Sequence, residues 1–173
     1  PLAFADFIGG LLNFDMSVQE PFKKAIDNLL YNGRDFRRNI NILTFNYTSV
    51  FEEILNRSTS RNRTLSSITR NGMEYSNRID SFNYVHSKIN EPLIFGVDNP
   101  DQITNTELLE NPYFLYAMVK PESNSKMRKH VVQHCEQAIN DSSVICIYGM
   151  SIGLTDSFWW SKIIDWLRED KSH

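Results

Sequence analysis

Residues 143–160 carry the sequence SVICIYGMSIGLTDSFWW, and this stretch decides the expected fold. Its apolar start, residues 144–148, is too short for an independent helix and rich in β-branched residues, which is typical of a buried strand in a parallel sheet. A turn punctuated by glycines follows, and Thr155 and Asp156 are favourable N-caps for the next helix. A strand, a glycine turn and a helix in this order place backbone N–H groups at the carboxyl edge of a sheet, where α/β proteins bind ligands.

Strand and helix patterns alternate along most of the remaining chain. Further strands are expected at residues 40–45, 82–86 and 92–97. Helices are expected at residues 2–12, 17–30, 49–55, 123–140 and 155–167, whereas residues 113–119 suit either a helix or a strand. This alternation predicts one α/β domain over residues 1–173, with a Rossmann-like, mainly parallel sheet flanked by helices.

The segment 57–81 differs from the rest of the chain because it is polar and locally basic. Five arginines stand there against two acidic residues, Glu74 and Asp80. The pair Asn71-Gly72 favours a hairpin turn between two strands, and a mobile insertion is an equally good interpretation. Pro1 stands in place of an initiator methionine, which predicts a processed or partial chain.

Composition and charge narrow the class of protein. The chain has 173 residues, of which 41% are hydrophobic and 23% are charged, as in ordinary soluble domains. A net charge of −3 disfavours a general nucleic-acid binder, and no apolar run is long enough for a membrane span. The start of the chain does not resemble a signal peptide, since it lacks basic residues and Asp6 interrupts its apolar stretch. Cys135 and Cys146 both lie in apolar patterns, and two buried thiols without a disulfide framework suit the reducing cytoplasm.

Polar residues stand where the expected strands end. Asn46, His86 and Asp98 follow three of these strands, and the turn 149–156 follows the fourth. Because the carboxyl ends of parallel strands share one sheet edge, these residues are expected to converge on one pocket. Each also has a structural interpretation: Asn46 as a turn residue or cap, His86 as a half-buried histidine, and Asp98 as part of a turn.

Two other patterns resemble a catalytic motif and a metal-binding motif. In each case the sequence does not show the further residues that such a site needs. Residues 149–153 match the G-x-S-x-G elbow of α/β-hydrolases, but the next helix is not expected to begin directly after Ser151, and the only later histidine is His173. His130 and His134 have the spacing of zinc ligands on a helix, but position 131 is valine, and the one further candidate ligand, Cys135, lies on another face. Two solvent-facing histidines and no bound metal are therefore expected.

Four short motifs stand in an order that is typical of one protein family. They are LTFNYT at residues 43–48, YVH at 84–86, LIFGVD at 93–98 and YGMSIGLTD at 148–156. In these motifs, over residues 42–160, the chain resembles the AbiH-type proteins of bacteriophage abortive infection. That family in turn resembles the sirtuin-like NAD-binding fold, in which an Asn after one strand and a His after the next line the nicotinamide pocket. A glycine-serine turn after a later strand contacts the nucleotide in that fold.

The resemblance implies an antiviral defence effector of the cytoplasm that hydrolyses the nicotinamide–ribose bond of NAD without a metal. Asn46 would orient the attacking water or a ribose hydroxyl, and His86 would serve as the general base. The further positions expected to contact NAD are Tyr47, Thr48, Gly96, Asp98, Gly149, Ser151, Gly153 and Asp156. A carboxylate at a helix N-terminus would repel phosphate, so Asp156 is expected to cap its helix or to bind a ribose hydroxyl.

Other functions and partners remain open at this point. The same pocket would serve a non-catalytic module that senses a nucleotide or a phage protein, and a serine hydrolase using Ser151 is a second alternative. The expected partners are a nucleotide, a phage protein as trigger and further copies of the chain. The sequence also departs from the family in two places. The opening Gly-Asn-Gly-Phe-Asp motif is absent, so the sheet is expected to lack its first strand, and Ser87 replaces the glycine that follows the histidine.

Overall fold

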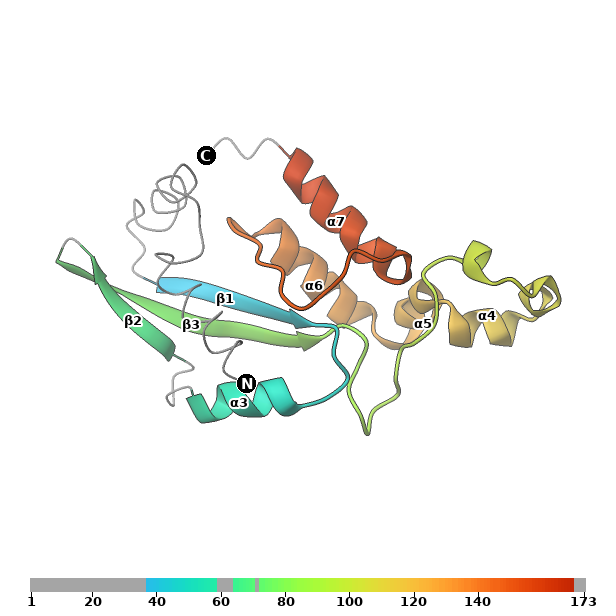
Figure 1. Ribbon diagram of the computed structural model, residues 1–173, viewed down its shortest axis with the longest axis horizontal. Coiled ribbons are helices and arrows are strands. Elements are labelled where there is room, and N and C mark those ends of the chain that lie inside the picture. The colour runs from blue at the N-terminus through green and yellow to red at the C-terminus, as the bar shows by residue number, and fades with distance from the viewer. Residues whose placement is uncertain (1–36, 59–63, 71, 170–173) are drawn as a thin grey trace. The chain divides into compact units, whose positions relative to one another are not determined.

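The computed structural model describes residues 37–58, 64–70 and 72–169 (Figure 1). The chain divides into two compact units. One comprises Pro1–Ile42 and Val50–Phe82, and the other comprises Leu43–Ser49 and Asn83–His173. The helices expected at residues 2–12 and 17–30 lie outside the described residues.

The first unit contains most of a three-stranded mixed sheet. Its elements are β1 (Arg37–Thr44), α3 (Val50–Ser58), β2 (Thr64–Arg70) and β3 (Met73–Tyr84). The strand order is β1-β3-β2, with β1 and β3 running in the same direction (Figure 1) and β2 antiparallel to β3. Arg70 pairs with Met73 across the turn, which confirms the predicted hairpin. Alternate residues of β3, namely Tyr75, Asn77 and Ile79, are buried, as the two-residue period of a strand requires.

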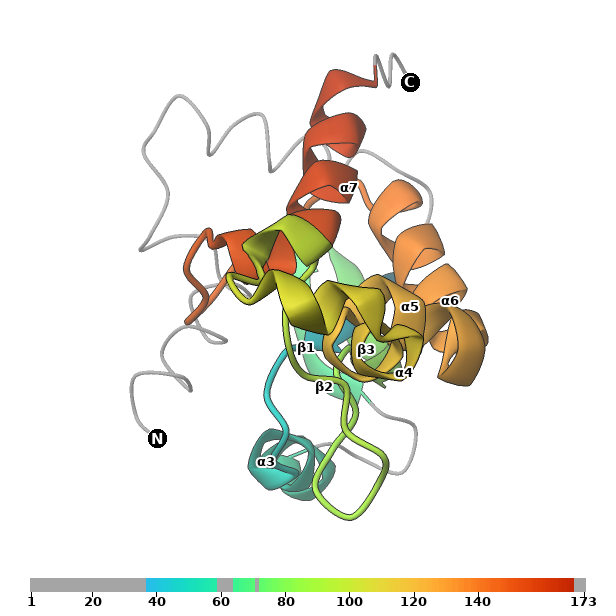
Figure 2. The same cartoon turned by 90° about the vertical axis from the view of Figure 1, so that its right-hand side faces the viewer.

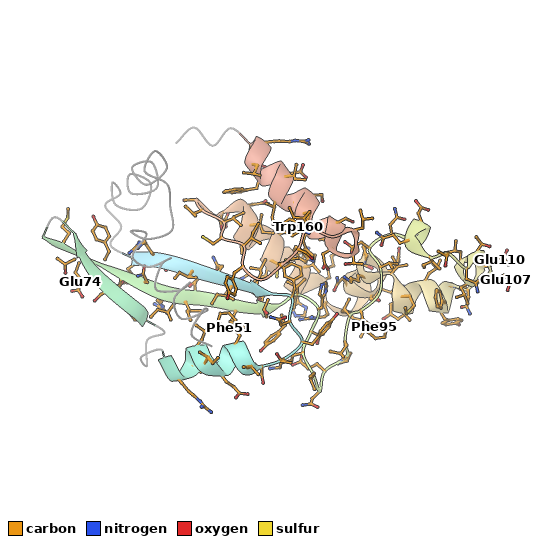
Figure 3. The ribbon with its side chains drawn as sticks, in the orientation of Figure 1. Phe51, Glu74, Phe95, Glu107, Glu110 and Trp160 are labelled. Atoms are coloured by element: carbon orange, nitrogen blue, oxygen red, sulfur yellow. The ribbon has the colours of Figure 1, made fainter. Side chains whose placement is uncertain are left out.

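Helix α3 begins at the residue after Ser49, which confirms the helix predicted there. Acidic residues occupy its first turn and Arg57 its last, an arrangement that the helix dipole favours. Its Leu55 is buried, and the Phe51 ring lies 5.6 Å from the ring of Phe82 on β3 (Figure 3). This aromatic pair therefore joins α3 to the sheet within the first unit.

The second unit begins with the ends of β1 and β3 and continues as a series of helices. They are the 3₁₀ helices η1 (Pro100–Gln102), η2 (Thr106–Glu110) and η3 (Leu154–Asp156), and the α-helices α4 (Pro112–Met118), α5 (Lys120–Met127), α6 (Lys129–Asn140) and α7 (Ser157–Arg168). Figure 2 shows α5 beside both α4 and α6, as the contacts between these helices also indicate. The segment 113–119, which suits either a helix or a strand, is mostly helix α4.

One predicted helix is two helices in the structure. Residues 123–140 were expected to be continuous, but Arg128 leaves the helical region, with φ −139° and ψ 28°, and separates α5 from α6. The Arg128 guanidinium donates a hydrogen bond to the Val85 carbonyl at 3.3 Å. This hydrogen bond joins residues 43 positions apart. Helical periodicity depends only on nearby residues, so the apolar stripe could not predict the break.

The core of the second unit lies between α6, α7 and the ends of β1 and β3. Its buried centre is formed by Val85, Cys135, Ile139 and Trp159. Partly buried side chains pack around it: Leu43, Phe45, Val131, Val132, Ile145, Phe158, Ile163 and Trp166. Burial raises the pKa of the Cys135 thiol to about 12, whereas Cys146 is exposed, so the expectation of two buried thiols is wrong for Cys146.

The residues of two predicted strands belong to no strand that the structure describes. In residues 92–97 only Val97 forms a bridge, to Val119, and residues 144–148 form none. Phe95, Ile147 and Tyr148 are about half exposed (Figure 3 labels Phe95). An isolated apolar run becomes a strand only when a neighbouring strand pairs with it, and no described strand lies in register with these segments. The Rossmann-like arrangement of the whole chain stays a prediction.

Candidate functional site

A buried histidine, a lysine and a carboxylate form one cluster in the second unit. His86 lies two residues after the end of β3, Lys120 is the first residue of α5, and Asp156 ends η3. One carboxylate oxygen, Asp156 Oδ1, lies 2.8 Å from His86 Nε2 and 2.7 Å from Lys120 Nζ. The Lys120 ammonium also donates to the Thr155 carbonyl. Only 4% of the His86 side chain and 8% of the Lys120 side chain are exposed, so solvent screens this cluster weakly.

A second carboxylate, Asp98, connects this cluster to helix α7. Its Oδ2 accepts hydrogen bonds from the Phe158 N–H at 2.8 Å and the Ser157 hydroxyl at 3.3 Å, and its Oδ1 lies 3.9 Å from Lys120 Nζ. Burial raises the pKa of Asp98, while these hydrogen bonds and Lys120 oppose the shift. Asp156 stands at the N-cap position of α7 but makes no capping hydrogen bond. The side-chain cap predicted for Asp156 is therefore wrong, because Asp98 supplies it from a distant loop.

The hydrogen bond to Asp156 sets the tautomer of His86. Burial lowers the pKa of His86 from its ordinary value of 6.5, and Lys120 adds to the shift, while Asp156 opposes it. The ring is therefore neutral at pH 7. A carboxylate accepts hydrogen bonds only, so the single ring proton must lie on Nε2. This leaves the lone pair on Nδ1, which is buried and has no hydrogen-bond partner in the described residues.

Aromatic rings hold the imidazole in place. The Phe45 ring meets it edge-on at 5.3 Å, and the Tyr47 ring stacks on it at 6.1 Å with an interplanar angle of 29°. The Tyr47 hydroxyl donates to the Ile94 carbonyl at 3.1 Å, and the Ile94 N–H donates to the His86 carbonyl at 3.0 Å. Burial raises the pKa of Tyr47, and the nearby Asp156 charge adds to the shift. His86 is thus fixed through both its ring and its backbone.

The residue after His86 has an unusual backbone conformation. Ser87 has a φ of +70°, in the left-handed region that favours glycine, and its hydroxyl donates to Glu91 Oε2 at 3.1 Å. This is the position at which the sequence has serine where the resemblance leads one to expect glycine. Serine adopts the conformation that glycine favours, and its side-chain hydrogen bond offsets part of the cost of that conformation.

A cavity of about 290 Å³ adjoins the cluster, close to the lower end of the range for ligand pockets. Its lining includes His86, Asp98, Lys120, Asn124, Lys129 and Trp159. Asn124 is only 7% exposed, and its buried Oδ1 has no hydrogen-bond partner in the described residues. The cavity therefore contacts two residues that each carry an unpartnered buried acceptor, His86 and Asn124.

The structure brings some of the predicted site residues together and leaves others apart. His86 and Asp156 belong to the cluster, Asp98 adjoins it through Lys120, and Tyr47 stacks on His86. Gly96 lies in the backbone turn before Asp98. The remaining predicted positions are outside the lining of the cavity: Asn46, Thr48, Gly149, Ser151 and Gly153. Asn46 is exposed, and its backbone N–H donates to Thr44 Oγ1 at 3.2 Å.

The sequence patterns did not identify three residues that line the cavity: Lys120, Asn124 and Lys129. Lys120 follows directly on the apolar run 113–119, and a cation at the end of an apolar run was the one available indication of its role. Asn124 and Lys129 stand in polar stretches where nothing marks them out. Both line the cavity, Asn124 from α5 and Lys129 from the start of α6.

The two competing motifs lack the geometry of a nucleophile elbow and of a metal site in the described residues. Ser151 is exposed, no strand precedes it, and α7 begins at Ser157 after a 3₁₀ turn, which is not the geometry of a nucleophile elbow. His130 and His134 are both exposed on α6. Within the described ranges no three His, Cys, Asp or Glu side chains gather in a way that could hold a metal ion.

The lowered pKa of His86 predicts a pH-dependent stability. Above pH 6.5 the ring is neutral in both states, whereas below 6.5 the unfolded chain binds a proton that the folded protein resists. The free energy of unfolding should therefore fall as the pH drops from 6.5 toward the pKa of folded His86. Urea unfolding at several pH values will measure this fall, which His86→Gln should reduce. An equally steep fall in that variant would contradict the prediction.

In a comparison with protein families, the model of the bacteriophage abortive-infection family AbiH matches residues 10–173. No curated protein and no solved structure matches the chain. In the part of the chain that the structure describes, no helix is both long and apolar enough to cross a membrane.

Proposed function

The chain belongs to the AbiH family of bacteriophage abortive-infection proteins, and we propose that it acts in abortive infection as a hydrolase, with NAD as its substrate. The observation that carries this proposal is the state of His86. Its Nε2–H donates to Asp156 Oδ1 at 2.8 Å, its Nδ1 has no partner among the described residues, and the residue lines a cavity. A neutral, oriented imidazole with one free nitrogen is the form that a general base requires.

The proposed reaction is attack of water on the ribose carbon that carries nicotinamide. The water oxygen bonds to that carbon, the bond to the nicotinamide nitrogen breaks, and His86 Nδ1 accepts the proton of the water. Asp156 stabilises the imidazolium that forms, as the acid of a catalytic triad does. Nicotinamide leaves as a neutral molecule, so this mechanism needs no acid for the leaving group. Asn46 has no part in it, because Asn46 is exposed and lies outside the lining of the cavity.

A second candidate is a module that binds a nucleotide without altering it. The observation in its favour is that Asn46 does not join His86 at the cavity, which leaves the base without the polar partner expected from the sequence. Binding needs only the cavity and its polar lining, whereas hydrolysis also needs the free nitrogen of His86.

Incubation of the purified protein with NAD tests the proposal. Nicotinamide and ADP-ribose should appear in equal amounts, and the rate should fall as the pH drops below the pKa of His86, because a protonated imidazole cannot accept a proton. Chromatography of both products at several pH values measures this. Binding of NAD without release of nicotinamide would support the second candidate instead.

A further inference from the structure

The cavity is lined by buried polar residues on its inner side and by an exposed, charged residue at its rim. In the buried part, His86 and Asn124 are 4% and 7% exposed, and each has an acceptor atom without a partner among the described residues. Buried polar atoms are nearly always hydrogen-bonded, so two such acceptors beside one cavity indicate a ligand that supplies donors. Hydroxyl or amino groups are donors of this kind.

One exposed residue of the cavity lining, Lys129, carries a positive charge that no described residue neutralises in an ion pair. Lys129 is the first residue of α6, is exposed, and makes no ion pair with any residue that the structure describes. The other lysine in the lining, Lys120, is already bound to Asp156 at 2.7 Å and lies 3.9 Å from Asp98. Lys129 is also at the N-terminus of a twelve-residue helix that has no side-chain cap, where an anion is favoured.

From this arrangement we infer that the cavity binds a ligand with two unlike ends, hydroxyl or amino donors against His86 and Asn124 and an anionic group against Lys129. A phosphorylated sugar has this form. The inference deepens the proposed function, because it concerns the same cavity and names the chemical class of its ligand. It assigns Asn124 and Lys129 to recognition. In the proposed complex with NAD the attacking water is the donor to His86 Nδ1, and in a complex with a sugar alone a sugar hydroxyl takes that place.

Three small probes separate the two ends: ribose, which has only the donors, inorganic phosphate, which has only the anion, and ribose 5-phosphate, which has both. Calorimetric titration of the full chain should show that ribose 5-phosphate binds at least about tenfold more tightly than either part, since a hydrogen bond to a charged group contributes about this factor. Lys129→Ala should weaken ribose 5-phosphate about tenfold and leave ribose unchanged. Asn124→Ala should weaken both sugars.

The matched control is Lys126→Ala, which removes a lysine from α5 whose ammonium lies over the Tyr116 ring, 4.7 Å from its centre and outside the cavity lining. This variant should bind all probes as the parent does. Equal affinities for ribose and ribose 5-phosphate, an unchanged affinity in Lys129→Ala, or no binding of any probe would overturn the inference.

The same measurements distinguish this inference from the proposed hydrolysis. Binding of ribose 5-phosphate that depends on Lys129, in a protein that releases no nicotinamide from NAD, would refute the hydrolysis and support the inference. Release of nicotinamide with a KM that Lys129→Ala leaves unchanged would refute the inference and support the hydrolysis.

Discussion

Replacement of His86 by alanine is expected to lower the rate of nicotinamide release from NAD by about 10²–10⁴, the usual contribution of a general base. The reason is that His86 lines the cavity and that its Nδ1 has no hydrogen-bond partner in the described part of the chain, so it can accept a proton. Single-turnover measurement of nicotinamide release gives the chemical rate directly. Protection of phage-infected cells by the same variant should be lost in parallel.

A second variant separates the loss of the base from a loss of folding. Asp156→Asn keeps the size of the side chain but replaces an acceptor with an amide that can donate to Nε2 of His86. The ring proton would then move to Nδ1, which could no longer accept one, and the rate should fall by a similar factor. His134→Ala, on the exposed face of α6, is the matched control and should keep the parental rate. Full activity in His86→Ala or in Asp156→Asn would contradict the assignment of the base.

Replacement of Gly96 by alanine is expected to lower the free energy of unfolding by roughly 2–5 kcal/mol, since backbone strain and a steric clash act together there. Gly96 has a φ of +118°, and an added Cβ would lie 2.1 Å from the Met118 carbonyl oxygen. That carbonyl accepts the Val97 N–H at 2.9 Å, in the bridge that positions Asp98 and Lys120. Denaturant unfolding measures the loss of stability, and binding to the cavity should weaken with it.

The matched control for this substitution is Gly149→Ala. Gly149 also has a positive φ, +63°, but nothing lies within 4 Å of the Cβ that alanine would add. Only the backbone strain remains, and it should cost about 1–2 kcal/mol. A loss of stability in Gly96→Ala no larger than in Gly149→Ala would show that the contact with Met118 is unimportant.

The amino-acid sequence alone predicts the elements whose cause is local. The apolar pattern of residues 40–45 becomes part of β1, the helix expected after Ser49 is α3, and the Asn71-Gly72 pair separates the paired strands β2 and β3. The helix predicted after Asp156 is α7, with Trp159 buried on its apolar face. Periodicity, caps and turn residues act over a few positions, so they can be recognised without the fold. The family motifs likewise mark His86, Asp98 and Asp156.

The tertiary structure alone decides how these residues are used. Asp156 is placed at the start of a helix by its sequence, yet it binds His86, 70 positions earlier, because Asp98 caps that helix in its place. Lys120 and Asn124 of α5 line the same cavity as Lys129, which begins the next helix after the interruption at Arg128. The apolar run 144–148 has the composition of a strand but no described strand beside it. Pairing partners, ion pairs and cavities depend on residues far apart in the chain, and local patterns carry no record of them.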